Sequence, residues 1–465
     1  MTSSTVLQRL AGLAHSVKFE DLPEPVVQSA RALILDTFGC ACGGYDSDAA
    51  SAVKAMVEDA GGHPQATIIG SGVKTSMALA TLANGTMLRY QDSNDYYFAR
   101  DPAHPSGNLA AALAVGERAG CSGKALIASL VAAYEVHLRF ADHAGKPALW
   151  GRGWHHGTNA QFSSAAVASL LLDPDAGQPL RTAHAMAIAG SHHNTLAQLQ
   201  SGEISMIKAS AEAWVAKGGV EAALLAARGV TGPLALIEGR HGWADSVAGE
   251  VDLEALLAPL DGTFRLSQVC IKPYPAVATA IAAVSAAIAL HPRCRGLLDD
   301  VSRIVVHLPT YALATPSGNP DRRYPASKES ADHSFYYCVA VALMDGACDE
   351  EQFTAAKITD SALRALLACT ALQADASLDS RWPGAAGGAV TVHLRDGTVL
   401  HERRVTPPGH PDNPLTPDAL AAKFHRHADP VLGSGGASTL RQQVETLQDC
   451  TDLRDFTRAL TRTNT

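Results

Sequence analysis

The chain has 465 residues, of which 47% are hydrophobic and 18% are charged, and this composition excludes a disordered protein. Its 37 basic and 46 acidic residues give a net charge of −9, which disfavours a general nucleic-acid binder. A small anionic ligand remains compatible, because a local basic cluster can override net charge. Since typical domains have ~150 residues, we expect one large and one smaller domain.

No segment predicts export or a membrane span. The N-terminal segment 1–8 is polar and lacks a basic stretch followed by an apolar one. The longest apolar run, 276–290, is broken by Thr279 and Ser285 and is shorter than the ~20 residues that a span needs. The nine cysteines include no C-x-x-C pair, which indicates neither a zinc site nor a disulfide framework. We expect a cytoplasmic protein.

The sequence up to about residue 265 predicts a succession of helices, because apolar residues recur at spacings of three and four. Alanine dominates the apolar residues, which favours helices packed closely on helices. The Thr158 hydroxyl is expected to cap the start of one helix, and Gly229 is expected to follow the end of another. The expected helices are 6–17, 23–39, 49–60, 76–88, 107–119, 123–141, 158–172, 180–191 and 209–228.

The pattern changes further along the chain. Residues 301–308 alternate as a half-buried strand does, and strands 389–395 and 398–402 flank Asp396-Gly397, a pair typical of a type I′ hairpin turn. Helical stretches at 334–344 and 360–367 lie between these strands. A smaller α+β domain is therefore expected over 267–404.

The tail of the chain again predicts helices. Residues 417–424 and 438–447 are helical in pattern, and a short flexible loop is expected at 433–438. We expect this tail to pack back on the helical part, so that 1–266 and 405–465 together form the large domain.

Four polar segments interrupt the helices, and each carries groups that could act on a carboxylate. The first, 91–108, holds three carboxylates, His104 before a proline and Ser106 at the start of the next helix. It offers a base, an acid and a helix N-terminus for an anion. The alternative is a solvated loop in which Ser106 caps the helix.

The second segment, 151–158, contains adjacent histidines, His155 and His156. Adjacent histidines rarely chelate one ion, and no third ligand lies at helical spacing, so a proton-transfer histidine is favoured over a metal site. A structural histidine bonded to the backbone is the alternative.

The last two segments each carry a lysine. Lys208 lies between apolar neighbours and could pair with a substrate carboxylate, or it could be a surface lysine. Lys272 lies in Lys-Pro-Tyr274-Pro at the expected domain boundary, where the prolines fix the backbone. There it could clamp an anion, or the segment could be a linker.

Taken in order, these motifs resemble the MmgE/PrpD family, which includes 2-methylcitrate dehydratase, cis-aconitate decarboxylase and iminodisuccinate epimerase. The resemblance rests on Asp92…His104-Pro-Ser-Gly, Gly-Trp-His155, Lys208 and Lys272-Pro-Tyr-Pro, and it covers nearly the whole chain. The segment 329–337 is similar to a further family signature, in a form closer to the dehydratases.

The resemblance implies a mainly α protein, with a large all-helical domain formed by both chain ends and an inserted α+β lid domain. The site would lie in the cleft, and members are usually homodimers without an organic cofactor or iron–sulfur cluster. The implied catalytic residues are Asp92, His104, His155, Lys208 and Lys272. Tyr96 would line the site, and Ser106 and Tyr274 are further candidate substrate-binding residues; no metal ligand is expected.

The expected activity is a cofactor-independent lyase that removes water from a hydroxy-tricarboxylate similar to 2-methylcitrate. The two lysines would bind carboxylates, His104 and His155 would exchange protons, and Asp92 would orient a histidine or act as the base. The family's His or Gln after the Lys-x-Tyr-Pro motif is absent, because 276–282 is apolar apart from Thr279. An epimerase or decarboxylase of a related di- or tricarboxylate, and a non-catalytic relative, remain alternatives.

Overall fold

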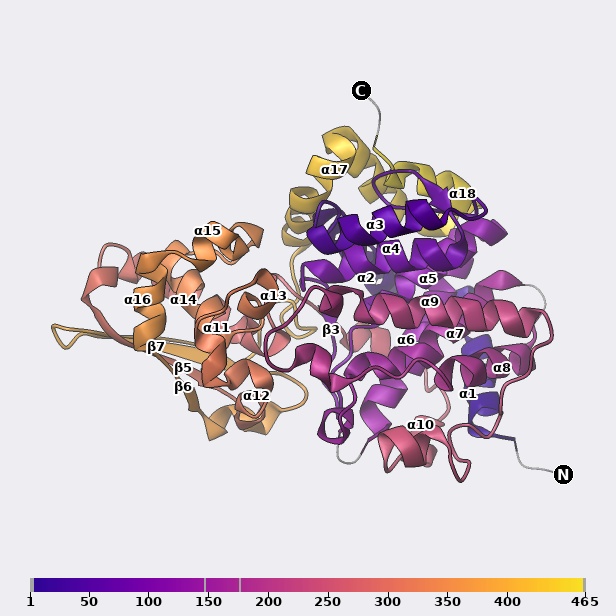
Figure 1. Ribbon diagram of the computed structural model, residues 1–465, viewed down its shortest axis with the longest axis horizontal. Helices are drawn as coiled ribbons and strands as arrows, with labels where there is room; N and C mark the ends of the chain where they lie inside the picture. The colour runs from indigo at the N-terminus through magenta and orange to yellow at the C-terminus, as the bar shows by residue number, and fades with distance from the viewer. Residues whose placement is uncertain (1–3, 146–147, 175–176, 463–465) are drawn as a thin grey trace. The chain divides into compact units, whose positions relative to one another are not determined.

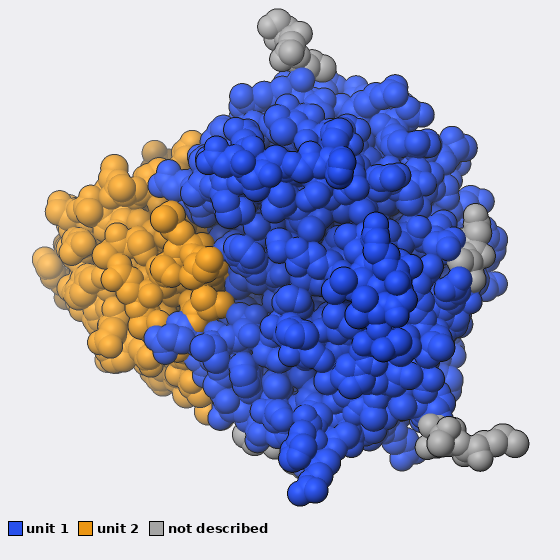
Figure 2. Space-filling view, turned by 45° about the vertical axis from the view of Figure 1, so that its right-hand side comes forward, with its two compact units in different colours: residues 1–198, 209–269, 417–465 blue, residues 199–208, 270–416 orange. Residues whose placement is uncertain are grey.

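The computed structural model describes residues 4–145, 148–174 and 177–462, and the chain divides into two compact units (Figure 2). Unit 1 comprises residues 1–198, 209–269 and 417–465, and unit 2 comprises 199–208 and 270–416. The domain limits expected from the sequence differ in three places, because segments 199–208 and 405–416 belong to unit 2 and residues 267–269 belong to unit 1.

Unit 1 is helical, which agrees with the expected fold class (Figure 1). Of the polar N-terminal segment, residues 1–3 lie outside the described residues. The nine helices expected before residue 230 are all present, and their ends lie within four residues of the expected ones. The helices are α1 Val6–Ser16, α2 Glu24–Gly43, α3 Asp48–Ala60, α4 Met77–Tyr90, α5 Asn108–Ala119, α6 Gly123–His143, α7 Ala160–Leu172, α8 Pro179–Gly190, α9 Ile207–Ala227, α10 Leu253–Leu256, α17 Pro417–Glu445 and α18 Leu453–Phe456.

Helix α6 forms the centre of unit 1. Every residue from 129 to 141 is buried, and α1, α2, α5, α7 and α10 all pack against it. A helix that is covered on all sides must satisfy the polar groups that it carries. Glu135 does so by pairing with Arg139 at 3.2 Å and with Arg265 at 3.1 Å.

Small residues let the helices approach closely, as the alanine-rich composition predicts. A Cβ atom at Gly85 of α4 would lie 2.7 Å from the Cβ of Ala213 in α9. A Cβ atom at Gly219 of α9 would lie 2.8 Å from the backbone nitrogen of Ala165 in α7. Neither contact leaves room for a side chain, so both glycines set the position of α9.

Two expectations in unit 1 are wrong. The Thr158 hydroxyl does not cap a helix, because it accepts from the backbone nitrogen of Thr195 at 2.9 Å and lies within a short 3₁₀ turn, His156–Asn159. The tail forms two helices, as expected, but no loop separates them at 433–438, because they meet at a kink within α17. Element α17 continues through Pro430 and changes direction at Gly433, where φ is 73°.

Unit 2 is built on a four-stranded sheet in the order β6-β5-β7-β8. Its central strands are antiparallel and β6 runs parallel to β5, with Val305 opposite Ala371. Helices α11 and α14 pack against each other and against the sheet (Figure 1). The strands are β5 Val301–Leu308, β6 Thr370–Ala374, β7 Gly388–Leu394 and β8 Val399–Arg404; the helices are α11 Ile281–Cys294, α12 Thr310–Leu313, α13 Lys328–Ala331, α14 Phe335–Asp345, α15 Ala355–Ile358 and α16 Ser361–Cys369.

The turn between β7 and β8 differs from the type I′ turn expected at Asp396-Gly397. Gly397 has a φ of 91°, but Asp396 does not share the positive φ that a type I′ turn requires. The backbone nitrogen of Gly397 donates to the carbonyl oxygen of Leu394, and the backbone nitrogen of Leu394 donates to the carbonyl oxygen of Thr398. The turn is therefore one residue longer, with glycine in the left-handed position.

Within the described ranges, no helix combines the length and the apolar character needed to cross a bilayer. The apolar run at 276–290 contributes mostly to α11, whose buried face packs on the sheet of unit 2.

Candidate active site

The loop that joins α4 to α5 in unit 1 is buried, which contradicts the alternative of a solvated loop. Residues 91–96 are all buried, including Asp92 and Tyr96. Asp92 has a φ of 51° and is the one non-glycine residue with a positive φ in the described part of the chain. Such backbone strain persists where the surrounding structure enforces it, and it is concentrated at functional sites. The strain singles out Asp92 independently of any motif.

Asp95, which sequence reasoning did not single out, organises this loop. Its carboxylate accepts from the backbone nitrogen of Ser106 at 3.1 Å, from the Ser106 hydroxyl at 2.5 Å and from the Tyr134 hydroxyl at 2.9 Å. Burial raises the pKa of Asp95 to about 6, although these hydrogen bonds act in the opposite direction. Ser106 is thus engaged with Asp95 and does not cap α5, whose N-cap is Gly107.

His104 is oriented through its Nδ1 atom, which lies 2.6 Å from the carbonyl oxygen of Asp95. A carbonyl oxygen can only accept, so Nδ1 carries the proton. The Nε2 atom of neutral His104 is then the proton-accepting position.

His155 is held in the opposite tautomer. Its Nδ1 atom accepts a hydrogen bond from the backbone nitrogen of Gly157 at 3.0 Å. An Nδ1 that accepts carries no proton, so His155 is neutral and its proton is on Nε2. The two histidines expected to exchange protons therefore present one acceptor and one donor.

A third histidine, His156, joins the two. The centroid of its ring lies 3.8 Å from that of His155 and 5.3 Å from that of His104. Its Nε2 atom lies 3.4 Å from Oε1 of Glu212 in α9, and Oε2 of Glu212 lies 3.0 Å from Nε of Arg89 in α4. The side chains of His156, Glu212 and Arg89 are all buried.

The position of Glu212 follows from the close contact between α4 and α9. Gly85 and Arg89 are one turn apart on α4, so they share the face that meets Ala213 and Glu212 on α9. Sequence reasoning missed both charged residues. The available signal was a single glutamate in an otherwise small and apolar stretch, Ala-Ser-Ala-Glu-Ala-Trp.

The remaining candidate residues belong to unit 2. Lys272 directly follows the short strand β4 Cys270–Ile271 and is 1% exposed. Two residues further along the chain, burial raises the pKa of Tyr274. Lys208 is also buried and acts electrostatically on Asp332. Burial raises the pKa of Asp332, but Lys328 at 2.8 Å, His333 and Lys208 outweigh it and hold that pKa below its usual value.

The structure thus distributes the eight candidate residues between the units. Unit 1 holds the residues expected to act as acids and bases and brings His104 and His155 together through His156, while unit 2 holds the buried lysines. The candidates in unit 1 are Asp92, Tyr96, His104, Ser106 and His155; those in unit 2 are Lys208, Lys272 and Tyr274.

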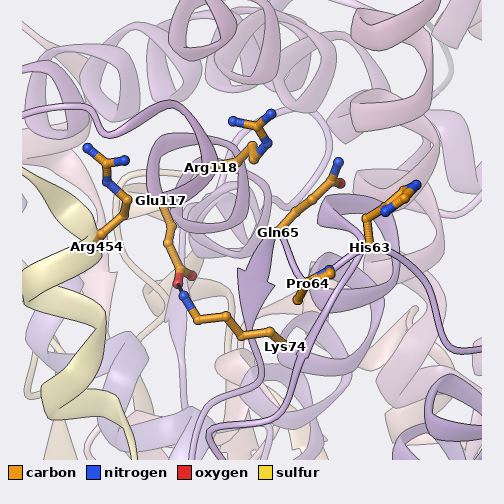
Figure 3. Close-up of a pocket in the computed structure, with 7 residues that line it drawn as sticks. All are labelled: His63, Pro64, Gln65, Lys74, Glu117, Arg118 and Arg454. Carbon is orange, nitrogen blue, oxygen red and sulfur yellow. Dashed lines mark ion pairs between the residues drawn. The ribbon is translucent and has the colours of Figure 1, made fainter.

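A cavity of about 500 Å³ in unit 1 is lined by residues other than His104, His155 and His156 (Figure 3). Figure 3 shows Lys74 reaching Glu117, with an Nζ–Oε1 distance of 2.8 Å, and Arg118 and Arg454 nearby. None of the predicted residues lines it. Over the described ranges, no cluster of three or more His, Cys, Asp or Glu side chains could hold a metal ion.

Comparison with known proteins covers both parts of the chain. The model of the MmgE/PrpD N-terminal domain matches residues 8–256, and that of the MmgE/PrpD C-terminal domain matches residues 274–449. The chain belongs to the MmgE/PrpD family.

Family members of named activity are similar to this chain over most of their length. Cis-aconitate decarboxylase of Mus musculus is 26% identical, in an alignment that covers 99% of this chain and 94% of the mouse protein. Mitochondrial 2-methylcitrate dehydratase of Yarrowia lipolytica is also 26% identical, over 91% of this chain and 83% of its own length. The 2-methylcitrate dehydratase of Cupriavidus necator is 27% identical, over 82% and 81%. These relatives are enzymes, which supports an enzyme here.

Proposed function

We propose that this MmgE/PrpD protein is a cofactor-independent carbon–oxygen lyase that removes water from a hydroxy-tricarboxylate of the 2-methylcitrate type. The observation that carries the proposal is the opposite tautomers of His104 and His155. Elimination of water needs a base for a C–H proton and a donor for the departing hydroxyl group, and the two rings offer one of each. The dehydratase relatives support the same reaction.

In the proposed reaction, His104 Nε2 removes the proton next to a carboxylate. The negative charge that develops on that carboxylate is stabilised by the ammonium groups of Lys208 and Lys272. The carbon–oxygen bond then breaks with its electron pair on oxygen, while His155 Nε2–H donates a hydrogen bond to that oxygen. The proton held by His104 leaves with the hydroxyl group as water, so both histidines return to their initial states.

A second candidate is the decarboxylation or epimerisation of a related di- or tricarboxylate. The similarity to cis-aconitate decarboxylase favours decarboxylation, which would use the same lysines and histidines. These reactions release no hydroxyl group and leave the donor at His155 without a leaving group to assist. A non-catalytic relative is the third candidate, supported by the apolar run at 276–282.

A substrate panel followed by NMR tests the proposal. Purified protein is incubated with 2-methylcitrate, citrate, cis-aconitate and iminodisuccinate, with and without EDTA. We expect 2-methylcitrate to lose water and give an olefinic product at a rate that EDTA does not change. Release of CO₂ from cis-aconitate, or epimerisation of iminodisuccinate, would instead support the second candidate. No reaction and no rise in melting temperature with any of the four would support the non-catalytic relative.

A further inference from the structure

His156 differs from its two histidine neighbours in what its ring faces. His104 faces a backbone carbonyl and His155 faces a backbone N–H, whereas Nε2 of His156 faces the carboxylate of Glu212 at 3.4 Å. A carboxylate at this distance stabilises the doubly protonated ring.

Glu212 is itself held in a buried ion pair. Its second oxygen pairs with the guanidinium of Arg89 at 3.0 Å, and both side chains are 3% exposed. Arg89 also donates to the amide oxygen of Asn94 in the loop of Asp92. The backbone at Gly107 and Gly157 approaches Glu212 closely, since a Cβ at either position would lie 3.1–3.3 Å from its side chain. The carboxylate therefore has little freedom to turn away from His156.

Two titratable neighbours of this pair, His155 and His137, carry no charge near pH 7. His155 is neutral, because its Nδ1 accepts from Gly157. His137 of α6 feels the charges of Glu212 and Arg89, and burial lowers the pKa of His137 to about 4, which leaves it neutral near pH 7. Arg89 is a like charge, but Glu212 lies between it and His156.

We propose that Glu212 is a positioning residue that keeps His156 as an imidazolium ion, and that this ion binds a substrate carboxylate beside His104 and His155. The part concerning the substrate rests on the proposed function. The ligand group is one carboxylate of a di- or tricarboxylate, because a buried cation in contact with both acid–base rings matches an anion next to the reacting carbon. No motif of the sequence assigns this role to Glu212 or His156.

The arrangement also has a consequence for the neighbouring rings. Two imidazolium ions in contact repel each other, so a positive His156 disfavours protonation of His155 and His104. A carboxylate that fixes one ring as the cation thus leaves His104 neutral and able to accept a proton.

An NMR titration of the full-length protein without substrate tests whether Glu212 keeps His156 as an imidazolium ion. In ¹⁵N-histidine-labelled protein, we expect the His156 pKa to fall by at least one unit in Glu212→Gln. The matched control is Glu117→Gln, another buried glutamate in an ion pair, with Lys74, which should leave the His156 titration unchanged. Since Glu212→Gln leaves Arg89 unpaired and could disturb folding, Arg89→Gln/Glu212→Gln is measured in parallel and should show the same fall. An unchanged His156 titration in either folded variant overturns the proposal.

Steady-state kinetics test whether His156 binds a substrate carboxylate. For a carboxylate that the parent protein converts, Glu212→Gln and His156→Gln should each raise KM about tenfold and change kcat by less than about threefold. A fall in kcat at unchanged KM, or no change in either, would overturn the carboxylate-binding role of His156. If the parent converts no carboxylate, the proposed function fails, whereas the titration still decides whether Glu212 holds His156 as a cation.

Discussion

Asp92 and Asp95 lie three residues apart in one buried loop and have different surroundings. The Asp95 carboxylate accepts hydrogen bonds from Asn94, Ser106 and Tyr134, and the carbonyl oxygen of Asp95 fixes His104. Asp92 has the strained backbone instead. The orientation of His104 therefore depends on the backbone of Asp95.

Removal of the proposed proton acceptor, His104, or of the proposed carboxylate-binding group, Lys272, should abolish most activity. His104→Ala and Lys272→Ala should each lower kcat by about 10²–10⁴-fold while folding normally, because proton transfer and charge stabilisation in the transition state each contribute on this scale. Steady-state kinetics and circular dichroism measure both effects. His63→Ala, at an exposed position in the cavity of Figure 3, is the control and should retain parent activity. Near-parent kcat in both variants would show that this site assignment is wrong.

The raised pKa of Asp95 should make the stability of the protein depend on pH. Its pKa rises from 3.8 to about 6 on folding, so between these values the folded state keeps a proton that the unfolded state loses. The free energy of unfolding contributed by Asp95 should therefore fall as pH rises from about 4 to about 6, by up to about 3 kcal/mol, and stay constant above.

Urea unfolding at pH 4 and pH 6.5 measures this dependence. The parent should lose stability relative to Asp95→Asn over this interval, because asparagine has no proton to lose. Asp46→Asn, at an exposed carboxylate, serves as the control and should show no comparable difference. Parallel pH dependence of the parent and Asp95→Asn would contradict the prediction.

The candidate residues that the sequence revealed are those in short polar motifs bounded by proline or glycine, such as His104 and Lys272. Both side chains are buried, and their catalytic roles stay predictions. Asp95, Arg89 and Glu212 were not singled out, because their partners are brought close by folding: Arg89 and Glu212 are more than a hundred residues apart. A motif records neighbours in sequence, whereas ion pairs between helices depend on how the helices cross.

At the scale of elements, helices were predicted better than strands. Amphipathic spacing and capping residues locate a helix locally. The strand β6 was not predicted, since its five residues, Thr-Ala-Leu-Gln-Ala, show little alternation and it is stabilised by parallel pairing with β5. The two helices of the tail were predicted, but a loop was expected between them at 433–438, because glycine and serine are typical of loops. Packing of α17 against α2 keeps the first part helical up to Gly433.

The contact between α17 and α2 includes a buried ion pair whose loss should destabilise unit 1. Lys423 Nζ lies 2.6 Å from Oδ1 of Asp36 and also 2.6 Å from the carbonyl oxygen of Ser93. Lys423→Met should lower the free energy of unfolding by about 3–5 kcal/mol, because it leaves a buried carboxylate uncompensated. The double variant Asp36→Leu/Lys423→Met should recover much of the loss.

Urea unfolding near pH 7 measures these differences. Arg441→Met, which breaks an exposed pair with Glu445, is the control and should cost less than about 1 kcal/mol. A Lys423→Met variant as stable as this control would contradict the prediction.

At the scale of the whole molecule, unit 1 presents an apolar surface that we predict to be a homodimer interface. Trp214 and Leu225 are 44% and 46% exposed and lie eleven residues apart on α9, which places them on one face of the helix. Large side chains exposed along one face mark interaction surfaces more often than scattered ones do.

Light scattering at micromolar concentration should give the mass of a dimer, and Trp214→Glu/Leu225→Glu should shift it to a monomer. Val399→Glu, at an exposed apolar residue of unit 2, is the control and should remain dimeric. A monomeric parent protein would reject the dimer, and a dimeric double variant would reject this location.

The contact of Lys423 with Ser93 also bears on the order in which the protein is synthesised. The loop of Asp92 is complete only when α17 has been made, after the whole of unit 2 has emerged from the ribosome. Ser93 and Lys423 are 330 residues apart, so at about 5–20 residues per second this interval is roughly 17–66 s. During that time the nascent chain exposes the face of α2 that α17 later covers, so the growing polypeptide presents a binding surface for chaperones that the finished protein lacks.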